Sequence, residues 1–146
     1  DEVSPTLDLI KGLGGALLRE KIIAQNAKTM IVIADASKRV QKLGIKSPVP
    51  VEVARFEHAA HATFFASLGC TASLRKKPDG TEYLTDNGNV IYDCRFPNGI
   101  DHPQALADAL AKRAGIVESG LFLGLARIAL IGNGRDVQTI SAADEP

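Results

Sequence analysis

An uninterrupted apolar run, Met30-Ile31-Val32-Ile33-Ala34, is the feature of this sequence that most constrains its fold. Such a run, rich in β-branched residues, is typical of a strand buried on both faces, as in a parallel sheet flanked by helices. Residues 16–27 precede it and predict a helix, because good helix formers surround apolar residues four apart, such as Leu18 and Ile22. Residues 1–45 therefore predict an α/β fold.

A different pattern fills the middle of the chain, after a break at Ser47-Pro48-Val49-Pro50. Asn87-Gly88 between β-rich segments is a strong hairpin signal, and Asp101 before His102-Pro103 is a helix N-cap candidate. The order of elements predicts a small α+β module of the ferredoxin-like kind. Its expected elements are a strand at 49–54, a helix at 56–68, a strand at 71–77, a hairpin of 83–85 with 89–94, a helix opening near 103 and a strand near 115–121.

The pattern of the first segment returns near the end of the chain. Residues 126–131 form another apolar run, which Gly132-Asn133-Gly134 turns back into 137–140. We therefore predict a partial, Rossmann-like parallel-sheet domain from residues 1–45 and 121–146. An inserted small α+β domain, residues 46–120, interrupts it.

Composition excludes several classes of function. Lys plus Arg and Asp plus Glu each total 17, so the net charge is zero and no global field attracts nucleic acid or an anionic membrane. The apolar runs are too short to span a bilayer, and two cysteines, Cys70 and Cys94, do not make a disulfide scaffold. We expect a cytoplasmic protein with reduced thiols and no nucleic-acid or membrane partner.

The segment from Lys11 to Lys21 is the strongest candidate for chemistry. Its glycine loop, Gly12-Leu13-Gly14-Gly15, opens the predicted helix and places free backbone amides beside the positive end of a helix dipole. A mobile lysine (Lys11), an amide cradle and one carboxylate (Glu20) suit proton transfer next to a carbonyl. The alternative is that the glycines serve turn geometry alone and that Glu20 is a solvated residue between two basic neighbours.

Three further candidates carry competing interpretations. Lys38 follows the buried strand, where ligands of open α/β sheets bind, so it is placed to bind an anion. Alternatively, Asp35 caps the next helical turn and Lys38 is solvated. His58 and His61 lie three apart on a predicted helix, but no further residue has metal-ligand spacing, so we expect no metal site.

Several motifs together resemble the ribose-5-phosphate isomerase type A family. Asp1 to Lys21 resembles the active-site segment, in which the end of a DGADE motif is followed by a lysine, a glycine-rich loop and LxREK. Further matches follow in order along essentially the whole chain: IVIADASK at 31–38, VPVEV at 49–53, TDNGN at 85–89, and GLF with IALIG between 120 and 132.

The resemblance implies interconversion of ribose 5-phosphate and ribulose 5-phosphate through an enediolate, without metal or organic cofactor. Glu20 matches the base that shuttles a proton between C1 and C2. Lys11 and the amides of Gly12, Leu13 and Gly14 would stabilise the enediolate oxygens. Asp1 matches an aspartate that contacts sugar hydroxyls and helps ring opening, and Lys38 matches a lysine near the phosphate. The resemblance also implies that this protein is a homodimer or homotetramer.

This chain departs from the family pattern at two places. Leu13 stands where the family usually has glycine, which matters only if that position needs a positive φ. The family's GTGST-like phosphate loop and the earlier aspartate of DGAD are absent, so the chain resembles a fragment that we expect to be inactive alone. The alternative function is a non-enzymatic sugar-phosphate sensor, which would need the anion site but no proton-transfer base.

Overall fold

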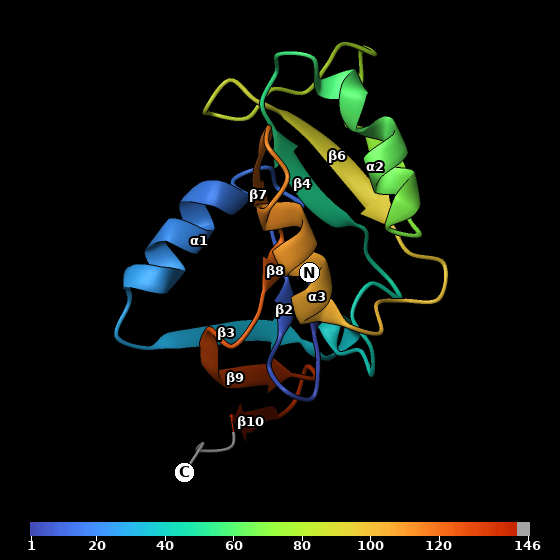
Figure 1. Cartoon of the computed structure of the whole chain (residues 1–146). Coiled ribbons are helices and arrows are strands. Elements are labelled where there is room, and N and C mark those ends of the chain that lie inside the picture. Colours follow the sequence, from blue (N-terminus) through green and yellow to red (C-terminus); the bar gives the residue numbers. More distant parts are fainter. Residues whose placement is uncertain (143–146) are drawn as a thin grey trace.

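The structure, a computed structural model, describes residues 1–142; residues 143–146, the end of the predicted α/β domain, lie outside the described residues (Figure 1). Within residues 1–142, three α-helices are formed by Leu17–Asn26 (α1), Ala62–Ser67 (α2) and Pro103–Ala111 (α3). Short 3₁₀ helices cover Ala36–Lys38 and His58–His61. The strands are Glu2–Val3 (β1), Leu9–Ile10 (β2), Met30–Asp35 (β3), Val49–Val53 (β4), Thr71–Leu74 (β5), Val90–Arg95 (β6), Ile116–Ser119 (β7), Leu121–Phe122 (β8), Ala126–Gly132 (β9) and Val137–Ser141 (β10).

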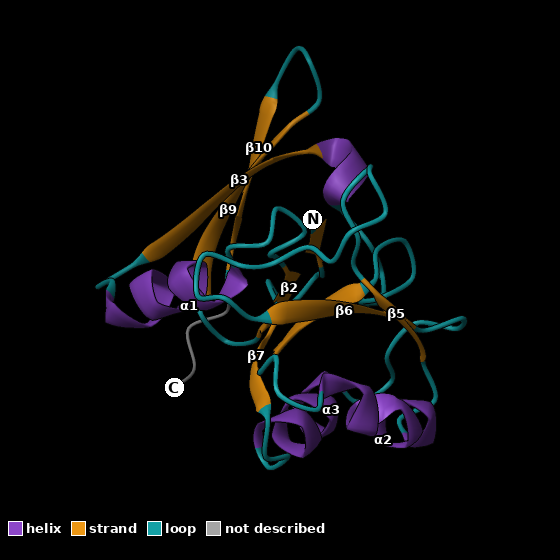
Figure 2. Cartoon of the chain, turned by 90° about the horizontal axis from the view of Figure 1, so that it is seen from above, coloured by secondary structure: helices purple, strands orange, loops and turns teal. Residues whose placement is uncertain are grey.

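Residues 49–119 form a four-stranded antiparallel sheet with two helices, here called the small module. Its strand order is β5-β6-β4-β7, and α2 and α3 lie on one face (Figure 2). The chain order β-α-β-β-α-β with this pairing confirms the predicted ferredoxin-like arrangement. Apolar side chains fill the space between the sheet and the helices, among them Val51, Val90, Phe65, Leu106 and Leu110.

Strand β4 is buried on both faces, whereas its alternating sequence predicts one polar face. Pro50 and Glu52 are buried along with the valines between them. The Gly120 amide donates to the Pro50 carbonyl at 2.8 Å, and side chains of residues 85–89 surround Glu52. Strand β4 lies between β6 and β7 in the sheet. It is also covered on the face opposite the helices, by loops that enter the candidate site.

A separate sheet has the order β10-β9-β3, in which β3 runs parallel to β9. The parallel pairing confirms the predicted α/β character, but the expectation that β3 is buried on both faces is wrong. Met30, Val32 and Ala34 pack on a core cluster, whereas Ile31 is 52% and Ile33 81% exposed. Strand β3 is at the sheet edge, and its alternate side chains point to opposite faces, only one of which is packed in residues 1–142.

The predicted helix at 56–68 begins later than expected. Glu57 has φ +50, which breaks helical geometry, and Phe56 is 87% exposed instead of lying on an apolar face. The chain enters a 3₁₀ turn at His58 and α2 at Ala62.

Two other local predictions are also wrong. Asp101 does not cap α3: its carboxylate pairs with Lys42 Nζ at 2.6 Å, while Pro103 opens the helix as predicted. Residues 83–85 are not a strand, because Thr85 turns to bond Glu52, and the hairpin partner of β6 is β5.

No helix of residues 1–142 has the length and apolar character needed to cross a membrane.

Candidate active site

The glycine loop leaves the short strand β2 at Lys11 and enters α1. The Lys11 amide donates to the Gly120 carbonyl at 2.9 Å, and the Gly15 amide closes a turn on the Gly12 carbonyl at 2.9 Å. Gly12 has φ +89, and a Cβ there would lie 2.3 Å from Leu17 Cβ, so a side chain at this position is excluded. No side chain of residues 1–142 caps α1, which leaves its first amides available to a ligand.

Lys11 and Glu20 meet beside this loop, as the sequence suggested. Lys11 Nζ lies 3.2 Å from Glu20 Oε2, and the two side chains are 33% and 34% exposed. Glu20 Oε2 is shielded from solvent, and apart from the ion pair with Lys11 it has no hydrogen-bond partner within residues 1–142. A carboxylate oxygen with uncommitted lone pairs, next to a cation, can accept a proton from a substrate carbon.

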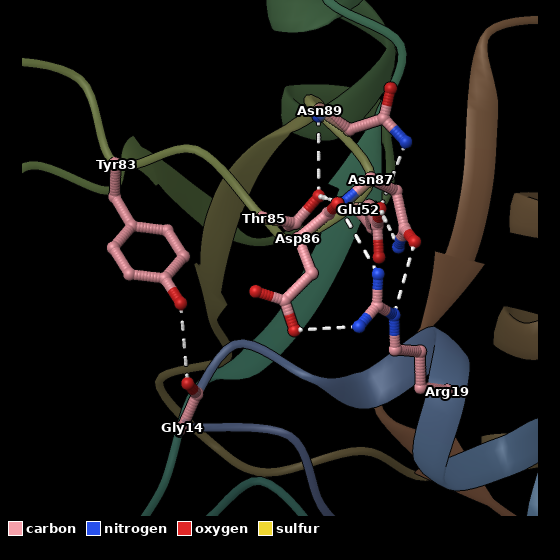
Figure 3. A network of polar contacts seen from close by, with 8 residues as sticks. All are labelled: Gly14, Arg19, Glu52, Tyr83, Thr85, Asp86, Asn87 and Asn89. Carbon is pink, nitrogen blue, oxygen red and sulfur yellow. Dashed lines mark hydrogen bonds and ion pairs between the residues drawn. The ribbon is translucent and has the colours of Figure 1, made fainter.

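Both basic neighbours of Glu20 anchor α1 to the small module, so the segment is more than a solvated helix surface. Lys21 is buried and donates to Glu118 Oε1 at 2.6 Å and to the Ser119 carbonyl at 2.7 Å. Burial lowers the pKa of Lys21, and the bond to Glu118 opposes that shift. Arg19 reaches the opposite side, where it contacts Asp86 and Asn87 (Figure 3). These contacts fix the rotation of α1 and hence the direction of Glu20.

Glu52 organises the loop that receives Arg19, a role that the sequence did not reveal. Its Oε1 atom accepts from Thr85 Oγ1 at 2.9 Å, Asn87 Nδ2 at 3.0 Å and Asn89 Nδ2 at 2.8 Å. Because the Asn87 nitrogen faces Glu52, its oxygen faces outward and accepts from Arg19 Nε at 3.4 Å (Figure 3). The local sequence gives no sign of this role, because only the tertiary fold brings residues 85–89 over this strand.

Asp1 and Lys38 lie at the same end of the molecule as the Lys11–Glu20 pair. Asp1 Oδ2 accepts from the Leu13 amide at 3.1 Å, so this amide is already engaged. The charges of Lys11 and Lys38 both act on the backbone nitrogen of Asp1. Two positive charges therefore converge on the region beside the glycine loop.

Asp35 has the capping role that was the alternative to an anion site. Its Oδ1 atom accepts from the Ser37 amide at 2.8 Å at the start of the 3₁₀ turn. Hydrogen bonds from Ser37 lower the pKa of the Asp35 carboxyl. The cap holds the turn that presents Lys38, whose side chain stays exposed.

Leu13 is compatible with the loop. Positive φ occurs at two non-glycine residues of the described chain, Leu7 and Glu57, and Leu13 is not one of them. Its side chain is 36% exposed and lines a surface hollow with Thr71 and Arg75. Position 13 therefore does not need a positive φ, and leucine fits the loop without backbone strain.

The histidines and cysteines have contacts of their own. His58 Nδ1 lies 2.9 Å from the Tyr92 hydroxyl, and the buried His61 receives a long hydrogen bond from Arg113 Nε at 3.5 Å. Within residues 1–142 no group of three or more His, Cys, Asp or Glu side chains could hold a metal ion. Cys70 and Cys94 are free thiols at the edge and in the core of the small module.

We predict that His61 makes the protein less stable in acid. Burial lowers the pKa of His61 from its usual 6.5, and the nearby charges of Arg113 and His58 lower it further. Between the folded-state pKa and 6.5 the unfolded chain binds more protons, so stability rises with pH and is lost as pH falls. In urea titrations from pH 7 to 5, we expect the His61→Phe variant to lose less stability than the unchanged chain.

The matched control is His102→Asn, which removes an exposed histidine at the N-cap position of α3, whose side chain forms no cap hydrogen bond within residues 1–142. Its stability should follow the same pH dependence as the unchanged chain. An identical loss for His61→Phe and His102→Asn would contradict the assignment to His61.

Comparison with known proteins places these features in a family context. The family description "Ribose 5-phosphate isomerase A (phosphoriboisomerase A)" matches residues 1–136. A ribose-5-phosphate isomerase A from Synechococcus sp. (strain JA-3-3Ab) is 47% identical over 135 residues, which cover 92% of this chain and 58% of the relative. The relative of the same name from Roseiflexus castenholzii is 45% identical and is matched over 99% of this chain and 61% of its own length.

Solved structures give the same result. A D-ribose-5-phosphate isomerase in complex with phospho-erythronic acid superposes with a TM-score of 0.92 at 39% identity, over 97% of this chain and 62% of that one. The present chain thus spans about three fifths of the length of the proteins that it matches.

Proposed function

Because the chain belongs to the ribose 5-phosphate isomerase A family, we propose that it forms the acid–base centre of an aldose–ketose isomerase that interconverts ribose 5-phosphate and ribulose 5-phosphate. The observation that carries the proposal is the Lys11–Glu20 pair, 3.2 Å apart, beside an uncapped glycine loop. The family relationship supports the choice of substrate. The pair of side chains supports the type of reaction.

The reaction moves one proton between two carbons. In the open-chain aldose, Glu20 takes the proton from C2, the C1–C2 double bond forms, and the negative charge goes to the C1 oxygen. Lys11 and loop amides stabilise this enediolate, because positive charge and N–H donors lie where negative charge develops. Glu20 then returns the proton to C1, while the hydroxyl proton of O2 passes to O1 and leaves a ketone at C2. No net oxidation occurs, and no cofactor is required.

Asp1 and Lys38 have supporting roles in this proposal. Asp1, held on the Leu13 amide, would bind sugar hydroxyls and assist ring opening. Lys38, exposed beside the same end of the site, would bind the phosphate as a mobile point charge. The loop amides of Gly12 and Gly14 complete the proposed substrate contacts, whereas the Leu13 amide, expected from the sequence to join them, is engaged by Asp1.

A sugar-phosphate sensor is the competing function. A sensor requires an anion site, which the loop and two lysines could supply. It has no use for a shielded carboxylate oxygen that, within residues 1–142, is contacted by Lys11 and by no other hydrogen-bond donor. That arrangement favours an enzyme.

The decisive experiment measures conversion of ribose 5-phosphate by two proteins. One is the 146-residue chain, which we expect to be inactive alone. The other is a chimera in which this chain replaces the matching part of the Synechococcus relative, which supplies the remaining length. Activity of the chimera that disappears in Glu20→Gln supports an isomerase. Chimeras that bind but do not convert the sugar phosphate would favour the sensor.

A ligand test adds an independent readout. Phospho-erythronic acid carries a phosphate and a carboxylate, whose two oxygens resemble those of the enediolate. A related isomerase binds this compound. We expect it to inhibit the chimera competitively, since the site should favour the intermediate over the substrate.

We also propose a two-domain division and self-association. Separate sheets support the boundaries near residues 45 and 120. Limited proteolysis should cut first near Ile45, which is 50% exposed, and not at Gly120, which is buried and hydrogen-bonded through its amide and its carbonyl. Exposed isoleucines on α1 and β3 support a homodimer or homotetramer, which light scattering would measure. The family relationship supports a cytoplasmic location.

A further inference from the structure

Two side chains of the small module hold consecutive carbonyls of the glycine loop. Arg75 Nη1 donates to the Leu13 carbonyl at 2.9 Å, and the Tyr83 hydroxyl donates to the Gly14 carbonyl at 3.3 Å (Figure 3 shows the second contact). Tyr83 packs directly against the loop, since a Cβ on Gly15 would lie 2.1 Å from the Tyr83 hydroxyl. The loop and the small module are therefore in direct polar contact.

Arg75 is itself fixed in place. Its Nε and Nη2 atoms form a two-point contact with Asp93 at 2.9 and 2.5 Å, which leaves Nη1 for Leu13. Its guanidinium group lies 5.6 Å from the centre of the Tyr83 ring. The side chain is 14% exposed. Bidentate, shielded pairing of this kind gives a planar guanidinium one orientation.

The contact to Leu13 determines where the Gly14 amide points. The Leu13 carbonyl and the Gly14 N–H belong to one planar trans peptide, so they point in opposite directions. Arg75 thus turns the Gly14 N–H away from the small module. The Leu13 amide binds Asp1 and the Gly15 amide binds Gly12, whereas the Gly14 amide has no protein acceptor within residues 1–142.

This peptide would otherwise be free to rotate. Gly14 has no Cβ and is exposed, and apart from itself and its two chain neighbours no residue of 1–142 has a heavy atom within 4 Å of where a Cβ would lie. Glycine permits both orientations of the preceding peptide at little cost, so the loop sequence alone does not choose between them. An external donor must make that choice.

We propose that Arg75 is a positioning residue, which orients the Gly14 amide toward the developing enediolate by holding the Leu13 carbonyl. The inference rests on the proposed isomerase function for its catalytic consequence, while the orientation of the amide is independent of it. Asp93 keeps Arg75 in the required orientation, and Tyr83 supports the next peptide.

The test compares Arg75→Gln with Arg95→Gln in the chimera. Arg95 lines the same surface hollow but contacts the Lys46 carbonyl and not the loop, so it is the matched control. We expect Arg75→Gln to lower kcat roughly 10- to 100-fold with little change in KM, because a transition-state donor is misdirected. Arg95→Gln should change neither constant. Equal kcat values for the two variants would overturn the proposal.

A measurement on the 146-residue chain does not depend on activity. In a sample labelled with ¹⁵N-glycine, the Gly14 resonance should be sharp in the unchanged chain and in Arg95→Gln. It should broaden by peptide exchange in Arg75→Gln. A sharp Gly14 resonance in Arg75→Gln would overturn the proposal even if the chimera is inactive. Retained activity in Glu20→Gln would instead overturn the proposed function and leave the amide result intact.

Discussion

Replacing Glu20 by glutamine is expected to lower kcat of the chimera by about a thousandfold, with the protein still folded. The amide keeps the size of the carboxylate but cannot take a proton from carbon. Lys11 would lose its ion-pair partner at 3.2 Å and remain able to bind substrate oxygens. The loss should therefore fall on kcat, with KM changed by less than about threefold. Steady-state kinetics with ribose 5-phosphate measures both constants.

The control for this variant is Glu57→Gln, at an exposed glutamate in the turn before α2. It changes the net charge by the same amount without touching the loop, so both constants should stay at the level of the unchanged chimera. Circular dichroism should show equal helix content in all three proteins. A kcat for Glu20→Gln within about threefold of the control would remove Glu20 from the proposed mechanism.

The second large effect concerns stability and follows from Glu2. This residue is fully buried, and its carboxylate accepts three backbone amides, from Gly44 at 2.6 Å, Lys46 at 2.7 Å and Ser47 at 2.6 Å. Glutamine would turn an N–H₂ group toward at least one of these donors and leave it unsatisfied. We expect the free energy of unfolding to fall by about 2 to 3 kcal/mol, measured by urea denaturation of the chain.

Glu57→Gln again provides the comparison, with an expected change within about 0.5 kcal/mol of the unchanged chain. The slope of the unfolding free energy against urea should be the same for all three proteins, which shows that the same surface is exposed on unfolding. A stability of Glu2→Gln equal to that of Glu57→Gln would show that the amides find other acceptors.

Elements with a local cause could be predicted from the sequence. The helix at 16–27, the strands at 49–54 and 126–131 and the proline at the start of α3 follow from patterning and backbone geometry, and all appear in the structure. The order of strands and helices was also sufficient to predict the ferredoxin-like pairing, since few topologies fit that order.

Errors arose where a residue has a distant partner. Asp101 has the sequence context of a cap but pairs with Lys42, and Thr85 has that of a strand but bonds Glu52. Ile33 has the context of a core residue but is on the exposed side of an edge strand. For Asp101 and Thr85, the tertiary contact outweighs the local structural preference. For Ile33, burial requires a neighbouring element on that face of the strand.

The same distinction between local sequence and tertiary contacts applies to the candidate site. By itself, the sequence determined the chemistry of the segment: a lysine, a flexible glycine loop and a carboxylate close enough along the chain to meet. Only the tertiary structure decided how that segment is held, because Arg75, Tyr83 and Glu52 come from distant parts of the small module. Glycine makes the loop adaptable, so its orientation depends on hydrogen bonds from outside, and such partners have no signature in the local sequence.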